Sequence, residues 1–158
     1  MRKTLLLVSL LTLVMPGRAF ADITGFIGVN TTPTTRQTSG FAVGAGLLIV
    51  AFEFEYSHTG EDVSTGAPSL KVGMGSVLLQ TPVAIGGIQP YFETGGGFYS
   101  EALGGRTDSG FALGTGGGVK ISLAGPLRLR VDYRGIKLGS GALASPAHRI
   151  YAGLNLKF

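Results

Sequence analysis

Charged residues recur at alternate positions in several segments of this 158-residue chain. The clearest case is the run Arg128, Arg130, Asp132 and Arg134, in which every intervening residue is apolar or aromatic. Successive side chains of a β-strand point to opposite faces, so these four groups share one face of a predicted strand. Such a face can supply ion pairs to a protein interior or charges to the lining of a pore.

Nine charged residues fall on faces that we expect to be enclosed. Five are positive and four are negative, and this near balance favours ion pairs, because an unpaired charge away from water carries a large desolvation cost. The predicted charge network consists of Glu53, Glu55, Lys71, Glu93, Lys120, Arg128, Arg130, Asp132 and Arg134. The same alternation places Arg149 and Lys157 on the enclosed side of the last segment.

Two histidines, His58 and His148, are the only ones in the chain. A histidine beside a serine and a carboxylate could support acyl transfer. Ser57 precedes His58 directly, but neighbours on one strand face opposite ways, and Ser145 is three residues from His148. We therefore assign no catalytic residue, and two histidines without a ligand cluster predict no metal site.

Glycine is unusually frequent, with 27 residues. The runs at 95–97 and 114–118 lie inside alternating segments and do not open a helix after a strand, so they predict no nucleotide or other cofactor site. On an enclosed face, glycine makes room for the large side chains of neighbouring strands.

The first 21 residues have the pattern of a signal peptide. Arg2 and Lys3 precede an apolar run, and residues 19–21 read Ala-Phe-Ala, with small residues where a signal peptidase reads. The apolar run is too short for a membrane-spanning helix, which is the alternative interpretation. We predict cleavage after Ala21 and a single domain over residues 22–158, exported to the periplasm.

The mature chain would be nearly neutral. It keeps 10 of the 13 basic residues against 9 acidic ones. A nucleic-acid partner is normally indicated by a strongly basic chain, and the near-neutral mature chain lacks that indication. The chain has no cysteine, which excludes a lipoprotein, a disulfide scaffold and a thiol enzyme.

Eight segments alternate with a period of two, and longer helical patterns are interrupted by glycine. The predicted strands are 23–30, 40–49, 52–58, 69–79, 88–100, 110–123, 127–137 and 149–158. In the fourth we expect Leu70, Val72, Met74 and Leu78 to face away from Lys71, toward lipid.

Short and long connections alternate between these strands. The short ones lie near Val50-Ala51, at 81–87 and at 124–126; the longer ones lie at 31–39, 59–68, 101–109 and 138–147. Transmembrane barrels have short periplasmic turns and longer outside loops. We therefore predict an all-β fold, an eight-stranded antiparallel up-and-down transmembrane β-barrel. A soluble β-sandwich or lipocalin-like barrel is the alternative, since it could show the charged faces to water.

Further signals concern the membrane surface. Aromatic side chains near strand ends are typical of interface girdles, and loop charges would be solvated. The expected girdle residues are Phe52, Tyr99, Phe111, Tyr133 and Phe158, and the expected loop charges are Glu61, Asp62, Glu101, Arg106 and Asp108.

The last ten residues alternate without a break and end on an aromatic. Together with the signal peptide and the segment 89–99, they resemble the small eight-stranded outer-membrane barrels of the OmpA transmembrane-domain and OmpX type. The resemblance implies that the last strand is recognised by the outer-membrane insertion machinery of a Gram-negative bacterium. The residues expected to carry this signal are Tyr151, Gly153, Leu154, Leu156 and Phe158.

The resemblance defines architecture better than activity. It implies a monomer in the bacterial outer membrane, in contact with membrane lipid and lipopolysaccharide. We expect a non-catalytic role in envelope integrity, adhesion or resistance to host defence, with a host or surface ligand bound through the outside loops. A small gated pore and a lipid A-modifying acyl hydrolase or transferase remain as alternatives, although the interior of eight strands is only wide enough for side chains to fill it.

Overall fold

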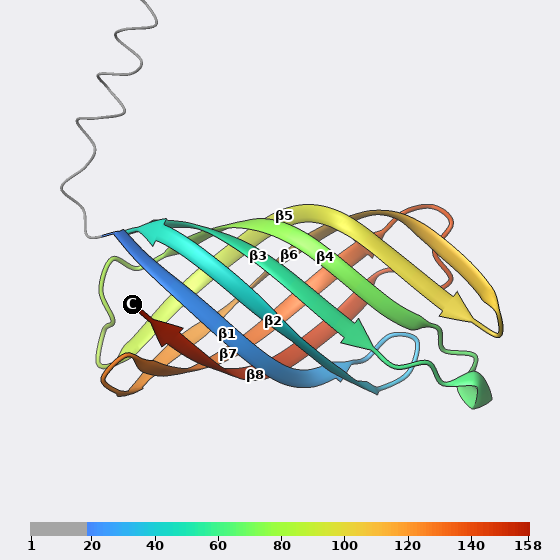
Figure 1. Ribbon diagram of the computed structural model, residues 1–158, viewed down its shortest axis with the longest axis horizontal. Coiled ribbons are helices and arrows are strands. Elements are labelled where there is room, and N and C mark those ends of the chain that lie inside the picture. Colours follow the sequence, from blue (N-terminus) through green and yellow to red (C-terminus); the bar gives the residue numbers. More distant parts are fainter. Residues whose placement is uncertain (1–18) are drawn as a thin grey trace, which may run out of the picture.

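Eight antiparallel strands form a closed barrel in the computed structural model, which describes residues 19–158 (Figure 1). Each strand pairs with its neighbours in sequence, and the last pairs with the first. The strands are β1 (Ala19–Asn30), β2 (Arg36–Leu47), β3 (Val50–Thr59), β4 (Ser69–Gln80), β5 (Ile88–Leu103), β6 (Arg106–Ala124), β7 (Leu127–Leu138) and β8 (Ala147–Lys157). The predicted fold class is confirmed.

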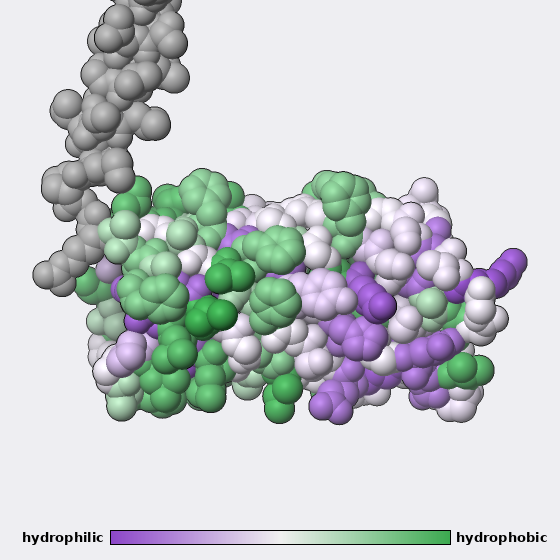
Figure 2. Space-filling model, viewed as in Figure 1, coloured by the Kyte–Doolittle hydropathy of each residue, from purple (hydrophilic) through white to green (hydrophobic). Residues whose placement is uncertain are grey.

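The alternation in the sequence turns the strands so that large apolar side chains cover the outside. Ile27, Phe52, Phe92 and Leu154 are all exposed on different strands, whereas their immediate neighbours point into the lumen. On the face drawn in Figure 2, this apolar surface is gathered over the half that holds the chain ends, with hydrophilic surface toward the opposite end. A closed barrel leaves no free strand edge, which suits a lipid environment.

Both described chain ends lie at the same end of the barrel, which we call the terminal end (Figure 1). Ala21 and Phe158 exchange two backbone hydrogen bonds there, of 2.8 and 2.9 Å. Residues 1–18 of the predicted signal peptide lie outside the described residues, and β1 begins at Ala19, ahead of the predicted boundary at residue 22. That boundary stays a prediction.

The opposite end, which we call the loop end, carries the connections 31–35, 60–68, 104–105 and 139–146. The second of these contains a short 3-10 helix, η1 (Val63–Thr65). No helix among the described residues is long and apolar enough to span a membrane.

Two predicted connections are placed differently in the structure. The segment 101–109 is not a loop: β5 and β6 continue through it and meet at a two-residue turn of Gly104 and Gly105, both at positive φ. The turn after β2 lies at Leu48 and Ile49, so that Val50 and Ala51 belong to β3. Backbone groups paired in a hairpin are satisfied whatever the side chains are, so a polar composition that is typical of loops does not exclude paired strands here.

The expected facing of β4 is wrong. Leu70, Val72, Met74 and Leu78 point into the lumen, and Lys71 is exposed on the outside. Both faces of this segment are largely apolar or glycine, so its alternation does not identify the outward face. The pairing of Lys71 with His58 on β3 and Ser100 on β5 sets the register.

Candidate functional site

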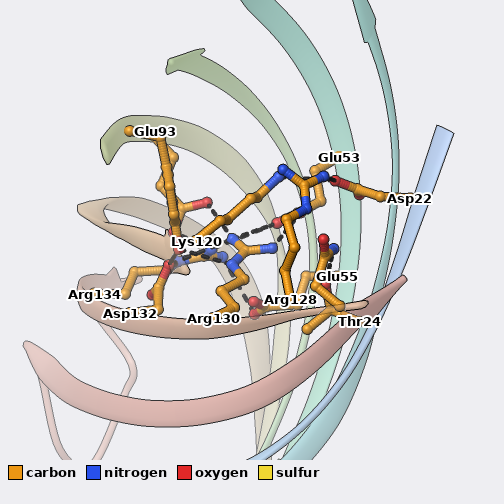
Figure 3. Close-up of polar contacts among 12 residues, drawn as sticks. Asp22, Thr24, Glu53, Glu55, Glu93, Lys120, Arg128, Arg130, Asp132 and Arg134 are labelled. Carbon is orange, nitrogen blue, oxygen red and sulfur yellow. Dashed lines mark hydrogen bonds and ion pairs between the residues drawn. The ribbon is translucent and has the colours of Figure 1, made fainter. Parts of the chain in front are cut away.

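The lumen of the terminal half is filled by a network of buried charges, with Arg130 of β7 at its centre (Figure 3). The Arg130 side chain is 0% exposed. Its two terminal nitrogens bind Glu53 of β3 as a pair, Nη1 to Oε2 at 2.5 Å and Nη2 to Oε1 at 3.0 Å. Nη2 also lies 3.4 Å from Glu93 and from Asp132. One guanidinium thus joins carboxylates of three strands.

Arg134 extends the network toward the loop end. Its Nη2 donates to Glu93, and its Nη1 lies 3.2 Å from Glu55 Oε1. Arg149 of β8 donates to the same Glu55 oxygen and, through Nη1, to Ser57 Oγ at 2.6 Å. These contacts join β3, β5, β7 and β8 across the lumen.

A second group of charges lies toward the terminal end. Lys120 of β6 donates to Asp22 of β1 at 2.8 Å, and Arg128 lies 3.8 Å from the same oxygen. Arg128 also donates to Gln89 at 2.8 Å. The two groups together contain five cations and five carboxylates, so the network is balanced in charge.

Aromatic residues pack against these charges. Arg130 Nε donates to the Tyr91 hydroxyl at 2.7 Å, and that hydroxyl donates to Asp132. Tyr151 stacks on Phe26 with ring centroids 4.1 Å apart, and the Arg149 guanidinium lies over both rings. The rings and ion pairs leave the guanidinium groups little freedom to move.

The structure brings together eight of the nine predicted network residues. Lys71 is the exception, because it points outward from β4. Arg149 joins the network as its predicted face suggested, and Asp22 is a member that sequence reasoning did not assign. Ile23, Ile27 and Val29 are exposed on the outside of β1, and their alternation was the signal that could have placed Asp22 inside.

The lumen of the loop half has a different lining. Buried apolar side chains from five strands pack there in one cluster, which we call the apolar plug: Leu70, Val72, Met74, Tyr99, Ala112, Ile136, Leu138 and Ala147. Tyr99 was expected in an outer girdle, but it points inward, and its hydroxyl donates to Asp108 at 2.6 Å. The lumen is thus packed by ion pairs in the terminal half and by apolar side chains in the loop half.

Other expected girdle residues do face outward. Phe52, Phe111, Tyr133 and Phe158 are exposed on the outer surface. In the last strand Leu154, Leu156 and Phe158 also face out, whereas Tyr151 and Gly153 face the lumen. Recognition of this strand by insertion machinery stays a prediction.

The loop-end connections are tied to one another, and we call this assembly the cap. Arg36 donates to Thr32 O at 3.0 Å and to Gly60 O at 2.9 Å, joining the first connection to the second. Glu61 Oε1 accepts from Gly104 N at 2.7 Å, which ties the second to the β5–β6 hairpin.

A third tie joins the hairpin to the last connection. Glu101 Oε2 accepts a hydrogen bond from Leu143 N at 2.8 Å. The expectation that Glu101 is a solvated loop charge is wrong, because its side chain is buried. Within the second connection, hydrogen bonds from Ser64 and Thr65 hold the pKa of the Asp62 carboxyl below its usual value. Every connection of the cap is thus held to at least one other.

Within residues 19–158, neither histidine side chain is hydrogen-bonded to a serine. His58 is exposed on the outside while Ser57 is buried inside. His148 Nδ1 bonds the Tyr133 hydroxyl at 2.8 Å, and Ser145 Oγ instead contacts the backbone of Leu138. Within residues 19–158, no three His, Cys, Asp or Glu side chains gather where they could hold a metal ion.

Solved structures with a similar fold come from bacterial outer membranes. The N-terminal β-barrel domain of Pseudomonas aeruginosa OprF has a TM-score of 0.70 at 14% identity, covering 90% of this chain and 99% of that one. Neisserial surface protein A follows with 0.67 at 15%, covering 89% and 97%. The Yersinia pestis outer-membrane protein Ail has 0.59 at 14%, covering 89% and 100%.

Two further structures bear on function. One is a crystal structure of Ail in complex with the heparin analogue sucrose octasulfate. The other is the outer-membrane enzyme PagL, which matches with a TM-score of 0.50 at 13% identity. No family model matches the chain. No curated protein matches it in sequence. Because this fold occurs in an enzyme as well, the fold alone does not decide between catalysis and other roles.

Proposed function

Since the chain has the fold of the small bacterial outer-membrane β-barrels, we propose that it is a non-catalytic, non-conducting outer-membrane protein that acts through its cap. The terminal end would face the periplasm and the cap the outside. Its role would be envelope integrity, adhesion or resistance to host defence. The observation that carries this proposal is the contrast between a lumen closed by the buried ion pairs and the apolar plug and loops tied into one ordered surface.

The filled lumen argues against a pore. Ions crossing the barrel would have to separate the Arg130 and Arg134 ion pairs and then pass the apolar plug. Both steps are costly, because the pairs are buried and an apolar constriction excludes hydrated ions. The proposal therefore includes an electrically silent barrel.

We predict no discrete conductance steps when the folded protein is inserted into planar lipid bilayers. The reason is that the buried ion pairs and the apolar plug close the narrow lumen. Single-channel recording checks this, with a known porin inserted under the same conditions as the positive control. Reproducible steps that change in size in an Arg130→Met variant would contradict the prediction and favour the pore.

The cap offers apolar side chains for contact with a partner. Val63 is 68% exposed and Leu143 is 54% exposed, on two connections joined through the β5–β6 hairpin. The ionisable groups nearby include the exposed Glu61 and Arg106 and the half-buried Asp62. This mixture does not resemble a cationic surface for a sulfated polyanion such as the molecule bound by Ail, so we favour a protein partner.

A deletion strain tests the role of the cap. We expect the strain to lose surface adhesion or serum survival, and the wild-type gene to restore it. The double variant Val63→Ser with Leu143→Ser should fail to restore it, because the apolar contacts are lost while the ties of the cap use other atoms. Val83→Ser is the matched control, since Val83 is as exposed as Val63 but lies on a turn at the terminal end.

Each variant must first be shown to reach the outer membrane and to migrate as folded barrel before boiling. The deletion strain could instead show detergent sensitivity as its only defect, and the cap variant could restore detergent resistance in full. That result would replace the surface role by a role in envelope integrity. A deletion strain indistinguishable from the parent in adhesion, serum survival and detergent resistance would contradict the proposal. A changed lipid A mass in that strain would instead support an enzyme.

A further inference from the structure

The charges on the outer surface of the barrel are unevenly distributed. Among the described strands, every carboxylate points into the lumen or belongs to the cap. Below the tip of the β5–β6 hairpin, the charged side chains that face outward are Lys71 on β4 and Lys137 on β7. Both lie toward the loop end. Outside the cap, the outer surface toward the loop end therefore carries cationic sites and no carboxylate to neutralise them.

Lys137 lies on the wall of a groove in this surface. The groove has a volume of about 410 Å³ and runs along β6 and β7, with Leu113, Thr115 and Gly135 among its lining residues and Pro146 at its loop end. Lys137 pairs directly with Leu113, and Gly135 pairs with Thr115. The groove thus descends from the cation toward the middle of the barrel.

The lining below Lys137 is apolar in character although it contains threonines. The Thr94 hydroxyl donates to Gly114 O at 3.3 Å, and the Thr115 hydroxyl donates to Glu93 O at 3.5 Å. Because these hydroxyls are bonded to backbone carbonyls, they do not call for a polar ligand. The methyl groups and Leu113 leave a surface suited to hydrocarbon.

Gly135 gives the groove its depth. A Cβ at this position would lie 3.8 Å from Thr115 O and 3.9 Å from His148 Nδ1, which are ordinary contact distances. The backbone therefore does not require glycine here. His148 pairs with Gly135 on the neighbouring strand. Its imidazole ring therefore lies beside the groove as a second ionisable group, in addition to the Lys137 ammonium.

We propose that this groove binds one phosphorylated glycolipid of the outer leaflet, of the lipid A class. One acyl chain lies against Leu113, Thr115 and Gly135, and a phosphate pairs with the Lys137 ammonium. The choice of occupant rests on charge complementarity and on the orientation given under the proposed function, in which the loop end faces outward. An ammonium–phosphate hydrogen bond is charge-assisted and is stronger than one between neutral groups.

Native mass spectrometry of the folded barrel in detergent tests the proposal, with diphosphoryl lipid A as the probe. We expect the wild type to retain one lipid A molecule and to retain phosphatidylglycerol at least tenfold less. Lys137→Gln should lower retention about tenfold, the effect of losing roughly 1.4 kcal/mol. Gly135→Leu should lower it similarly by filling the groove, and Lys137→Arg should preserve most of it.

Lys71→Gln is the matched control, because Lys71 is an exposed lysine facing the same leaflet but does not line this groove. It should leave retention unchanged. Equal losses in Lys71→Gln and Lys137→Gln would overturn the proposal in favour of general surface charge. Unchanged retention in both Lys137→Gln and Gly135→Leu, or equal retention of phosphatidylglycerol, would also overturn it.

Two measurements keep this test separate from the proposed function. Unboiled electrophoretic mobility confirms that each variant is folded before the lipid is added. Cell fractionation then asks whether the protein lies in the outer membrane at all. Absence from that membrane would remove the proposed function and its orientation, whereas lost selectivity for lipid A in a correctly located barrel would remove the groove assignment alone.

Discussion

Replacing Arg130 with methionine should lower the free energy of unfolding of the barrel by about 3–5 kcal/mol, the range for breaking a buried ion pair by removing one partner. Methionine occupies part of the space of the arginine but cannot neutralise its neighbours. Glu53 loses both hydrogen bonds from the guanidinium, and Tyr91 loses the donor to its hydroxyl. Each of these groups is buried, so water cannot replace the lost contacts without opening the lumen.

Urea titration in lipid vesicles checks the effect. The chain has no tryptophan, so the folded fraction is better followed by the mobility of unboiled protein and by circular dichroism than by intrinsic tryptophan fluorescence. Lys71→Met serves as control, because it removes a cation that is exposed and unpaired with any described carboxylate. A loss below about 1 kcal/mol for Arg130→Met, equal to that of the control, would contradict a network that depends on its central cation.

A double variant separates two contributions to the lost stability, the broken ion pair and the lost side-chain packing. In Arg130→Met with Glu53→Gln, the carboxylate most directly deprived of its partner is also neutral. We expect this variant to regain part of the stability lost in Arg130→Met, because neutral groups cost less to leave buried than charged ones. Glu93 and Asp132 remain ionisable, and for that reason the recovery should be incomplete.

The part of the network that could be predicted from sequence lies where polar and apolar residues alternate clearly. On β7 the charges of Arg128, Arg130 and Asp132 alternate with leucine and valine, and a strand with such contrast has one possible facing inside lipid. On β4 the contrast is missing, since Leu78 and Leu79 are both apolar and glycine stands at several positions. The lumen of the loop half is itself apolar, so the rule that charge marks the inside fails there, and Lys71 was placed on the wrong face.

The contacts of the cap could not be predicted for a different reason. Glu101 lies in a polar segment whose composition is typical of loops, and its partner is the backbone nitrogen of Leu143, 42 residues away. Arg36 likewise bonds carbonyls of two separate connections. Such contacts depend on which loops the barrel brings together, and no local pattern of residue types records that. The alternation that predicts the strands therefore says little about the surface on which the proposed function depends.

Substituting Gly97 by alanine should also destabilise the barrel strongly, by roughly 3 kcal/mol, the upper part of the usual range for overpacking. Gly97 of β5 faces the lumen. A Cβ there would lie 1.9 Å from the carbonyl oxygen of Gly73 and 2.7 Å from the Cα of Met74, both on β4. These are backbone atoms, so no rotation of a side chain can relieve the contact, and the two strands must shift apart.

Gly73→Ala is the matched control for Gly97→Ala. The two glycines lie on adjacent strands, but Gly73 faces outward, and a Cβ there would meet nothing within 4 Å. Alanine reduces the conformational freedom of the unfolded chain relative to glycine, so this substitution should be neutral or stabilising by up to about 1 kcal/mol. Urea titration of both variants gives the comparison.

Equal stabilities for the two variants would mean that β4 and β5 separate easily at this point, and the close approach at Gly97 would then have no structural importance. A large difference would show that glycine on the enclosed face is required by the distance between neighbouring backbones. In that case the high glycine content reflects two separate needs. Lumen-facing positions such as Gly97 permit close packing of narrow strands, whereas outward positions such as Gly73 are open to substitution by the larger residues that lipid accepts.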